Sequence, residues 1–236
     1  MVTGRTALVT GANGGLGREI AIKLASEGCV VSLLGRKNLH NVCKKIESSH
    51  PQSVGRLFFL DFCDAQSFDI FLNLDIHFDI LINCAGVFPV KNLSDSTSDD
   101  YSKCFDVNVK APFLLSKKFA EGMKQQEWGR IVNIGSSSAY AGSDNSGLYC
   151  ASKHALLGLS RSQHLELKSH NVRVFCLSPG SIKTDMGKQV PNQDYSTFMD
   201  PKDIAEYLVQ MIKFDSEMIS EAVSYTHLTL PTILRV

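Results

Sequence analysis

The chain has 236 residues, with 24 basic and 24 acidic side chains and 44% hydrophobic residues, which fits one globular domain. The balanced charge argues against a nucleic-acid or membrane-surface partner, and the longest apolar runs, such as 80–82 and 111–115, are too short to span a bilayer. The seven cysteines are scattered without a C-x-x-C pair, and the seven histidines show no ligand spacing. We therefore expect a reduced, cytoplasmic protein with no metal site.

The N-terminal segment predicts a strand, a glycine-rich loop and a helix. Thr6–Thr10 reads as a buried strand close to Met1, so we expect no signal peptide. It leads into Gly11-Ala-Asn-Gly-Gly-Leu-Gly17 and then into an amphipathic segment from Arg18 onward. Glycines permit a tight turn and close approach of the backbone to phosphate, and a helix N-terminus attracts negative charge. The alternative is an ordinary glycine-rich turn, but the flanking strand and helix favour a dinucleotide-binding loop.

The second predicted strand, Val30–Leu34, is followed by Gly35-Arg36. An NAD-binding fold places an acidic residue about twenty residues beyond the loop, where it binds the ribose hydroxyls. The guanidinium of Arg36 suits a 2′-phosphate instead, and Lys37 could assist it. We therefore predict NADP(H) in preference to NAD(H), with a merely solvated Arg36 as the alternative.

The remaining elements alternate along the chain as in a doubly wound fold. Further strands are predicted at Arg56–Leu60, Asp79–Asn83, Gly129–Ile134 and Val172–Leu177, with the approach to another at Glu217–Ala222. Helices are predicted at Asn38–Ser49, Ala65–Leu74 and Ser98–Gln125, and from Leu148 and Pro201 onward. The predicted fold class is α/β: a single doubly wound Rossmann domain over residues 1–222, with a parallel sheet of about six or seven strands and helices on both faces.

The segment from Ser136 to Lys153 carries a pattern for acid–base chemistry. Tyr149 follows Ser136 by thirteen residues and precedes Lys153 by four. Residues four apart are neighbours on a helix, and the lysine cation should lower the pKa of the phenol towards neutrality. Such a phenol can exchange a proton with a substrate oxygen, which Ser136 could also hold. Taken alone, the pattern also fits a surface tyrosine beside a solvated lysine, and Ser137 and Ser138 are rivals of Ser136.

The two motifs together resemble the short-chain dehydrogenase/reductase family. Its members carry a T-G-x-x-x-G-x-G loop, here at Thr10, Gly11, Gly15 and Gly17, and a downstream Y-x-x-x-K pair, here Tyr149 and Lys153. The resemblance covers about residues 4–222 and is closest to 3-oxoacyl-(acyl-carrier-protein) reductase-like members. It implies that the first part of the cofactor site consists of Thr10, Gly11, Asn13, Gly14, Gly15, Leu16, Gly17 and Arg36.

The resemblance also assigns residues further along the chain. Asn83-Cys84-Ala85-Gly86 matches the family's N-N-A-G apart from Cys84, and 178–184 matches P-G-x-x-x-T. In the family an asparagine in the long helix bends it and holds a water linked to the catalytic lysine, which here implies Asn108. Asp61 is implied beside the adenine ring, but it could equally be an N-cap or turn residue. The implied cofactor contacts are Asp61, Phe62, Asn83, Ala85, Gly86, Tyr149, Lys153, Pro179, Gly180, Ile182 and Thr184.

The C-terminal third carries less information. Asp185–Asp200 corresponds to the family's substrate lid, and five of its apolar residues could line a pocket or simply pack: Met186, Val190, Tyr195, Phe198 and Met199. Residues 223–236 resemble one reading frame of a sequencing-library adapter, so we expect a tail that is not part of the native protein. The alternating pattern of this tail would also fit a strand.

The predicted activity is NADP(H)-dependent interconversion of a carbonyl and a secondary alcohol, with 3-oxoacyl thioesters among the expected substrates. The resemblance implies a catalytic set of Asn108, Ser136, Tyr149 and Lys153, in which the phenol supplies the proton. The alternative, a non-enzymatic NADP-binding sensor or scaffold, is disfavoured because all four residues are present. We expect a small-molecule carbonyl or alcohol substrate, no nucleic-acid or membrane partner, and a homodimer or homotetramer.

Overall fold

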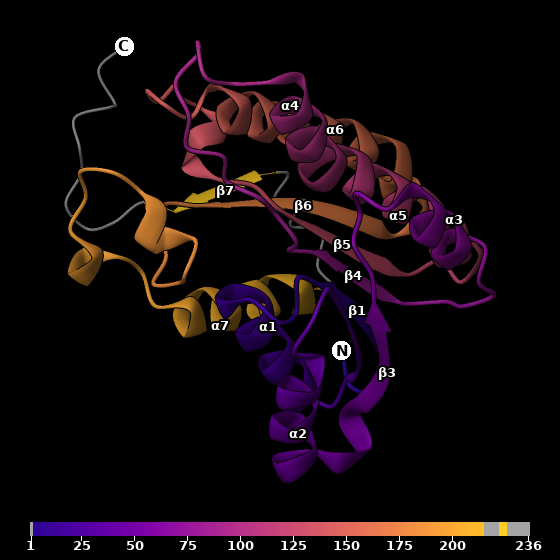
Figure 1. Ribbon diagram of the computed structural model, residues 1–236. Coiled ribbons are helices and arrows are strands. Elements are labelled where there is room, and N and C mark those ends of the chain that lie inside the picture. The colour runs from indigo at the N-terminus through magenta and orange to yellow at the C-terminus, as the bar shows by residue number, and fades with distance from the viewer. Residues whose placement is uncertain (1, 215–221, 226–236) are drawn as a thin grey trace.

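A parallel sheet runs through the centre of the computed structural model, which describes residues 2–214 and 222–225 (Figure 1). The described strands are β1 (Thr6–Thr10), β2 (Val30–Gly35), β3 (Val54–Phe59), β4 (Ile80–Asn83), β5 (Gly129–Ile134), β6 (Val172–Pro179) and β7 (Ala222–Tyr225). The described α-helices are α1 (Gly15–Ser26), α2 (Leu39–Ser49), α3 (Ala65–Leu72), α4 (Ser98–Phe105), α5 (Ala111–Gln125), α6 (Gly147–Leu167) and α7 (Pro201–Lys213). The predicted doubly wound α/β class is confirmed.

The strand order is β3-β2-β1-β4-β5-β6-β7, and every neighbouring pair is parallel. The chain winds outward from β1 to β3, returns to β4 beside β1, and winds outward again in the other direction. The carboxyl ends of β1 and β4 therefore meet where the winding reverses. Open parallel sheets bind their ligands at this switch point.

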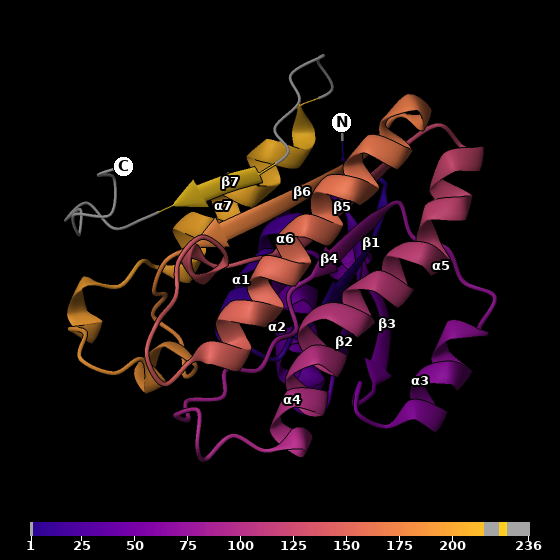
Figure 2. The same cartoon turned by 90° about the horizontal axis from the view of Figure 1, so that it is seen from above.

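The strands are buried on both faces, which explains their continuous apolar runs. In β1, Ala7 and Val9 pack into the core shared with α1, α2 and α7, whereas Leu8 packs into the core on the other face. Figures 1 and 2 show the two helical layers, with α3, α4, α5 and α6 on the side opposite α1, α2 and α7. The alternation of the pleat thus places one apolar run in both cores.

The last residues of the glycine loop belong to the helix that follows it. The helix α1 begins at Gly15 rather than at Arg18, so the last glycines of the loop form its first turn. Their backbone N–H groups lack partners within the helix and point towards the switch point. This start strengthens the positive end of α1 where a phosphate group would lie.

The predicted long helix over Ser98–Gln125 is interrupted. A π-helical turn, Asp106–Lys110, joins α4 to α5, and Asn108 lies buried inside this turn. An extra residue in the turn forces the helix to bulge, and such bulges are frequent at functional sites. The implied bend at Asn108 is therefore present as a local π-turn.

The helix α3 is short and is fixed at both ends. Asp64 caps its start by accepting hydrogen bonds from the Ser67 backbone N–H (3.2 Å) and hydroxyl (2.6 Å). The Lys118 ammonium of α5 donates to the carbonyl oxygens of Leu72 (2.8 Å) and Leu74 (2.7 Å) beyond its end. These carbonyls have no helical partner of their own, so the helix stops at Leu72 instead of the predicted Leu74.

The C-terminal end is described only in part. Residues 222–225 form β7 in parallel register with Cys176–Pro179 of β6, so this strand crosses the predicted boundary at residue 222. Most of the predicted strand approach, 217–221, and residues 226–236 lie outside the described part of the chain. The adapter origin of 223–236 therefore stays a prediction. Among the described residues, no helix is both long and apolar enough to cross a membrane.

Candidate active site

The carboxyl ends of the central strands open into a cavity of about 800 Å³. It brings together nearly all residues that the sequence assigns to the site, from the glycine loop after β1 to the segment after β6. The predicted residues that line it are Gly11, Asn13, Gly14, Gly15, Leu16, Gly17, Arg36, Asp61, Phe62, Ala85, Gly86, Ser136, Tyr149, Lys153, Pro179, Gly180, Ile182 and Thr184. Thr10, Asn83 and Asn108 do not line it, and each has another role.

The glycine loop is packed so closely that side chains do not fit. Gly11 has φ +64° and faces the next loop, where a Cβ atom would lie 2.8 Å from Ala85 Cα. A Cβ atom on Gly17 would collide with the carbonyl oxygen of Gly11, and one on Gly15 would lie 2.7 Å from Thr184 Cγ2. Three separate chain segments thus meet around the start of α1. The spacing of the glycines follows from these contacts.

Thr10 and Asn83 lie behind the cavity wall, and their implied cofactor contacts stay predictions. The Thr10 hydroxyl donates to Ile82 O (3.3 Å) and accepts from the backbone N–H groups of Cys84 and Ala85 (3.0 Å each). The Asn83 amide donates to Asn133 Oδ1 (2.8 Å). Both side chains are buried, and these bonds link β1 to the loop after β4 and β4 to β5, whereas Asn83 Oδ1 has no hydrogen-bond partner.

One end of the cavity is formed by Arg36 and Asp61. The Arg36 Nη1 atom lies 3.6 Å from Asp61 Oδ2, and both side chains are exposed. Asp61 also accepts a hydrogen bond from the Cys63 backbone N–H (3.1 Å), so it is a turn residue, and the N-cap of α3 is Asp64 instead. An exposed ion pair contributes little stability. The guanidinium therefore remains available to a competing anion.

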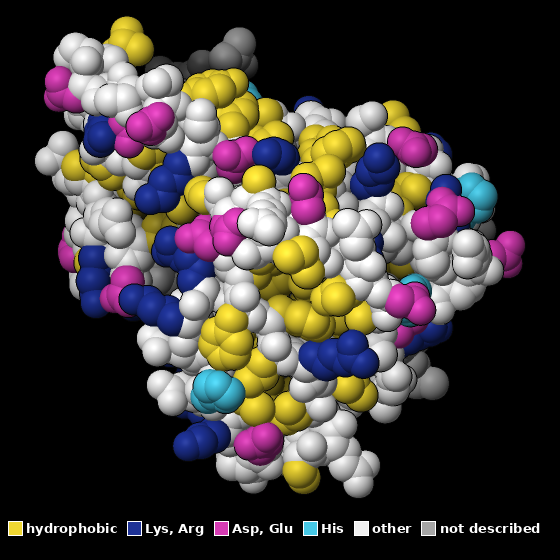
Figure 3. Space-filling view, turned by 45° about the vertical axis from the view of Figure 1, so that its right-hand side comes forward, with side chains coloured by type: hydrophobic (Ala, Val, Ile, Leu, Met, Phe, Trp, Pro, Cys, Tyr) yellow, Lys and Arg dark blue, Asp and Glu magenta, His cyan; other side chains and the backbone are white. Residues whose placement is uncertain are grey.

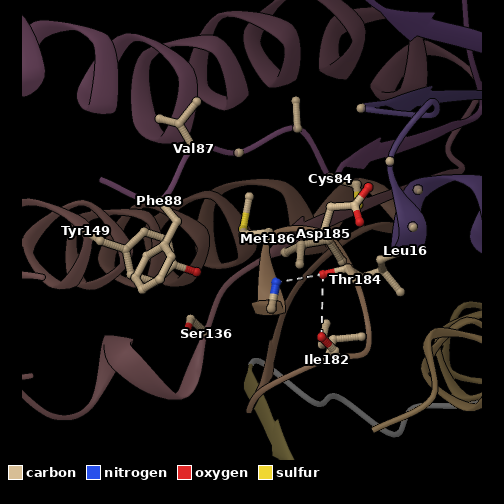
Figure 4. Close-up of a pocket in the computed structure, with 18 of the residues that line it drawn as sticks. Leu16, Cys84, Val87, Phe88, Ser136, Tyr149, Ile182, Thr184, Asp185 and Met186 are labelled. Atoms are coloured by element: carbon tan, nitrogen blue, oxygen red, sulfur yellow. Dashed lines mark hydrogen bonds between the residues drawn. The ribbon is translucent and has the colours of Figure 1, made fainter. Parts of the chain in front are cut away.

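Ser136, Tyr149 and Lys153 meet at the other end of the cavity. Figure 4 shows Ser136 near the Tyr149 ring, and the Ser136 hydroxyl accepts a hydrogen bond from the Ser138 backbone N–H (3.1 Å). Lys153 is 4% exposed and donates to the carbonyl oxygen of Ile134 (2.7 Å). The helix α6 thus presents the phenol and the ammonium one turn apart, as predicted.

The predicted effect of Lys153 on the Tyr149 pKa is wrong for this arrangement. Burial raises the pKa of Tyr149 to about 12, while the Ser136 hydroxyl acts in the opposite direction. The Lys153 Nζ atom lies 5.6 Å from the centre of the tyrosine ring, and burial lowers the pKa of Lys153. The loss of hydration of a phenolate outweighs the neighbouring polar groups. Tyr149 is therefore protonated at neutral pH.

Asn108 links the catalytic helix to the loop after β4. Its Oδ1 atom accepts from the Val87 backbone N–H (2.9 Å), and its Nδ2 group donates to Val87 O (3.0 Å) and to Ser152 Oγ (3.0 Å). Ser152 in turn donates to the carbonyl oxygen of Tyr149 (2.8 Å). Asn108 Oδ1 and Lys153 Nζ both face Gly86, at 3.4 Å and 3.9 Å from where its Cβ atom would be. Asn108 thus acts directly on the backbone around the site.

The sequence reasoning did not single out Ser152, Val87 or Phe88. Ser152 is fully buried one residue before Lys153, so its place inside the Y-x-x-x-K motif was the available signal. Phe88 lines the cavity and packs against Tyr149 with ring centres 4.7 Å apart. Its place shortly after the N-C-A-G segment was the only signal, because no spacing rule marks it.

The segment after β6 divides the five apolar residues that had two possible roles. Met186, Val190 and Tyr195 line the cavity. Phe198 is buried, and Met199 pairs with Ile182 and packs against the core. The segment therefore supplies both cavity-lining residues and packing residues, and the apolar composition alone could not tell which residue has which role.

The arrangement matches a known family. The family model described as short chain dehydrogenase matches residues 5–194. The chain belongs to this family. The predicted class, an NAD(P)-dependent short-chain oxidoreductase, is thereby confirmed.

Curated relatives and solved structures agree with this assignment. The 3-oxoacyl-[acyl-carrier-protein] reductase of Rickettsia conorii is 32% identical over 187 residues, 78% of this chain and 76% of the relative. A putative NAD(P)-dependent gluconate 5-dehydrogenase from Beutenbergia cavernae with bound NADP has a TM-score of 0.81 at 27% identity, covering 88% of this chain and 89% of the other. A 4-hydroxyisoleucine dehydrogenase complexed with NADH has a TM-score of 0.82 at 26% identity, covering 94% and 96%.

We expect Gly17→Ala to weaken NADPH binding at least about ten-fold, or about 1.4 kcal/mol. The added methyl group would collide with the Gly11 carbonyl oxygen, so the loop must shift away from the phosphates. The measurement is a titration of nicotinamide fluorescence. Gly158→Ala is the matched control, because nothing lies within 4 Å of its Cβ position in α6; it should bind normally. Equal affinities for Gly17→Ala and the wild type would contradict the role of the loop.

We expect Tyr149 to ionise near pH 12 in protein without added cofactor, because burial raises its pKa to about 12. Folding therefore favours the protonated phenol. The contribution of Tyr149 to the free energy of unfolding is fully present below pH about 10, the pKa of a tyrosine in the unfolded chain, and is lost as the pH rises through about 12. The measurement is phenolate absorbance as a function of pH. Subtracting the curve of Tyr149→Phe from that of the wild type gives the ionisation of Tyr149 alone among the six tyrosines. Circular dichroism monitors the fold, and a midpoint near neutrality would contradict the prediction.

Proposed function

We propose that this protein is an NADP(H)-dependent carbonyl reductase in which Tyr149 gives the proton to the substrate oxygen. The observation that supports this most is the meeting of Ser136, Tyr149 and Lys153 in the same cavity as the glycine loop. A protonated phenol on the cavity wall beside a hydroxyl suits the donation of a proton to an oxygen that gains negative charge. We therefore favour reduction as the reaction that the site performs.

The residues around the cavity fit a dinucleotide. The glycine loop leaves room for phosphate groups at the N-terminus of α1, because its glycines have no side chains there. Arg36 would hold a 2′-phosphate at one end, releasing Asp61, which favours NADP(H). Solved relatives carry NADP in one case and NADH in another. The choice between the two cofactors in this chain therefore rests on Arg36.

We propose the following roles for the residues at this end of the cavity. When bound, the nicotinamide supplies the hydride to the substrate carbon. Ser136 and Tyr149 hold the substrate oxygen, and the Tyr149 hydroxyl transfers its proton to it. Lys153, whose ammonium donates to the Ile134 carbonyl at the end of β5, would hold the nicotinamide ribose. Asn108 keeps α6 and the loop after β4 in place through Ser152 and Val87.

We propose 3-oxoacyl thioesters as the first substrate class to examine. The support is the naming of a 32% identical relative as a 3-oxoacyl-[acyl-carrier-protein] reductase. At this identity, substrate preference can differ between relatives that share their catalytic residues. The thioester thus belongs in a panel with diketones, keto sugars and a steroid ketone.

We propose a cytoplasmic protein with a small-molecule substrate, on the basis of its thiols and its surface charges. All seven cysteines are free thiols, which favours a reducing compartment such as the cytoplasm. On the face in Figure 3, basic and acidic side chains are interspersed, which favours a small-molecule substrate over a nucleic acid. We propose a homodimer or homotetramer through the long helices; Phe113 of α5 is 44% exposed in the single chain.

We expect Tyr149→Phe to lower kcat at least about 100-fold, because it removes the proton donor, and to leave NADPH affinity nearly unchanged. NADPH oxidation against the carbonyl panel measures the first effect, and fluorescence titration measures the second. Tyr140→Phe is the matched control: Tyr140 is 46% exposed just before α6 and does not line the cavity. If Tyr149→Phe retains wild-type turnover, the proposed mechanism is wrong.

We expect Arg36→Ala to raise the KM for NADPH by roughly 10- to 100-fold, which is the worth of a charge-assisted hydrogen bond pair, and to change the KM for NADH little. The comparison uses steady-state kinetics with both cofactors. Arg56→Ala serves as the control, because Arg56 is exposed on β3 and does not line the cavity. A wild type that prefers NADH, or an equal loss with both cofactors, would refute the phosphate-binding role.

A further inference from the structure

Phe88 is the aromatic side chain in contact with the Tyr149 ring. It lies in the loop between β4 and α4 and lines the cavity. The centres of the two rings are 4.7 Å apart and their planes are inclined by 73°, which is the edge-to-face arrangement that aromatic pairs prefer. Figure 4 shows both rings at the same end of the cavity as Ser136. A substrate group bound on this side of Tyr149 would therefore lie beside Phe88.

The backbone that carries Phe88 is held firmly. The preceding residue, Val87, has both its N–H and its carbonyl oxygen bonded to the Asn108 side chain, at 2.9 Å and 3.0 Å. Asn108 is 1% exposed, so water does not compete for these bonds. The same amide reaches the backbone of Tyr149 through Ser152. One buried side chain thus sets the distance between the two rings.

Packing of the core does not account for Phe88. Its neighbour Val87 packs against the cluster that contains Leu81 and Leu115, but Phe88 belongs to none of the described core clusters. The ring is half-buried at the cavity wall. A fixed phenyl group in such a position occupies space that a substrate group would otherwise take. Its removal should therefore change what the cavity accepts more than how well the chain folds.

We propose that Phe88 determines substrate specificity by closing the space beside Tyr149 to bulky groups. With the ring in place, the site accepts carbonyl compounds whose group on that side is small or linear, such as aliphatic oxo compounds. It disfavours those that carry an aryl group there. This inference rests on the proposed carbonyl reductase function, and it names a residue that selects among substrates without transferring a proton itself.

The test pairs a variant with a substrate that fills the space it opens. Phe88→Ala removes a phenyl ring, and 1-phenylpropane-1,2-dione carries one where butane-2,3-dione has a methyl group. We expect the ratio of kcat/KM for the aryl dione to that for the methyl dione to rise at least about ten-fold over wild type, within the range that pocket size changes produce. The KM for NADPH should stay unchanged. A ratio within about two-fold of wild type would overturn the proposal.

Leu93→Ala is the matched control. Leu93 lies in the same loop and is 94% exposed, so its truncation tests for a general effect of loosening the loop. We expect the substrate ratio of Leu93→Ala to equal that of the wild type. If it shifts as much as in Phe88→Ala, the ring itself is not the selecting element and the proposal fails.

A binding measurement separates this inference from the proposed function. The aryl dione is titrated into each protein saturated with NADP⁺, and its dissociation constant is read by calorimetry. Absence of turnover by wild type with every carbonyl of the panel would reject the reductase function alone. Binding at least about ten-fold tighter to Phe88→Ala than to wild type would still support the selecting role of Phe88, and equal or weaker binding would reject it.

Discussion

The buried amide of Asn108 is the interaction on which the catalytic end of the molecule depends. It lies in the π-helical turn between α4 and α5 and binds the backbone of Val87 on one side and Ser152 on the other. A buried amide left without partners would destabilise the fold by about 1–3 kcal/mol, so the turn, the loop after β4 and the start of α6 must stay together. The phenol of Tyr149 and the ring of Phe88 take their relative positions from this arrangement.

Burial then sets the chemistry that the phenol can perform. The pKa of Tyr149 is raised to about 12, and the nearby Lys153 directs its ammonium to the Ile134 carbonyl. A protonated phenol can donate to a substrate oxygen at neutral pH, whereas an alcohol would need the phenolate as a base. Low dielectric around the site also strengthens each hydrogen bond to the reacting oxygen.

The α/β class and most of the segments that line the cavity could be predicted from the sequence because both are marked by local patterns. The glycine spacing, the Y-x-x-x-K pair and the apolar runs each indicate a contact or an element formed by residues that are close in the sequence. Bonds to partners distant in the sequence could not be predicted: the Thr10 hydroxyl accepts from the Cys84 backbone N–H, and the Asn83 amide donates to Asn133. The expected lowering of the Tyr149 pKa failed for the same reason. A spacing of four residues reports proximity to Lys153, but it does not report the burial that outweighs it.

The two ends of the cavity differ in how strictly their shape constrains the residue types. At the cofactor end, backbone atoms pack against backbone atoms: Gly17 lies on the Gly11 carbonyl, and Gly11 lies on Ala85. A side chain cannot be added at these positions, so the glycine spacing in the sequence indicates a dinucleotide ligand. At the substrate end, the wall consists of side chains from loops, among them Phe88 and Met186. Their size can change without moving the backbone, and this freedom lets one fold serve many substrates. A cofactor class can therefore be predicted from the sequence, whereas a substrate class requires the geometry around Tyr149.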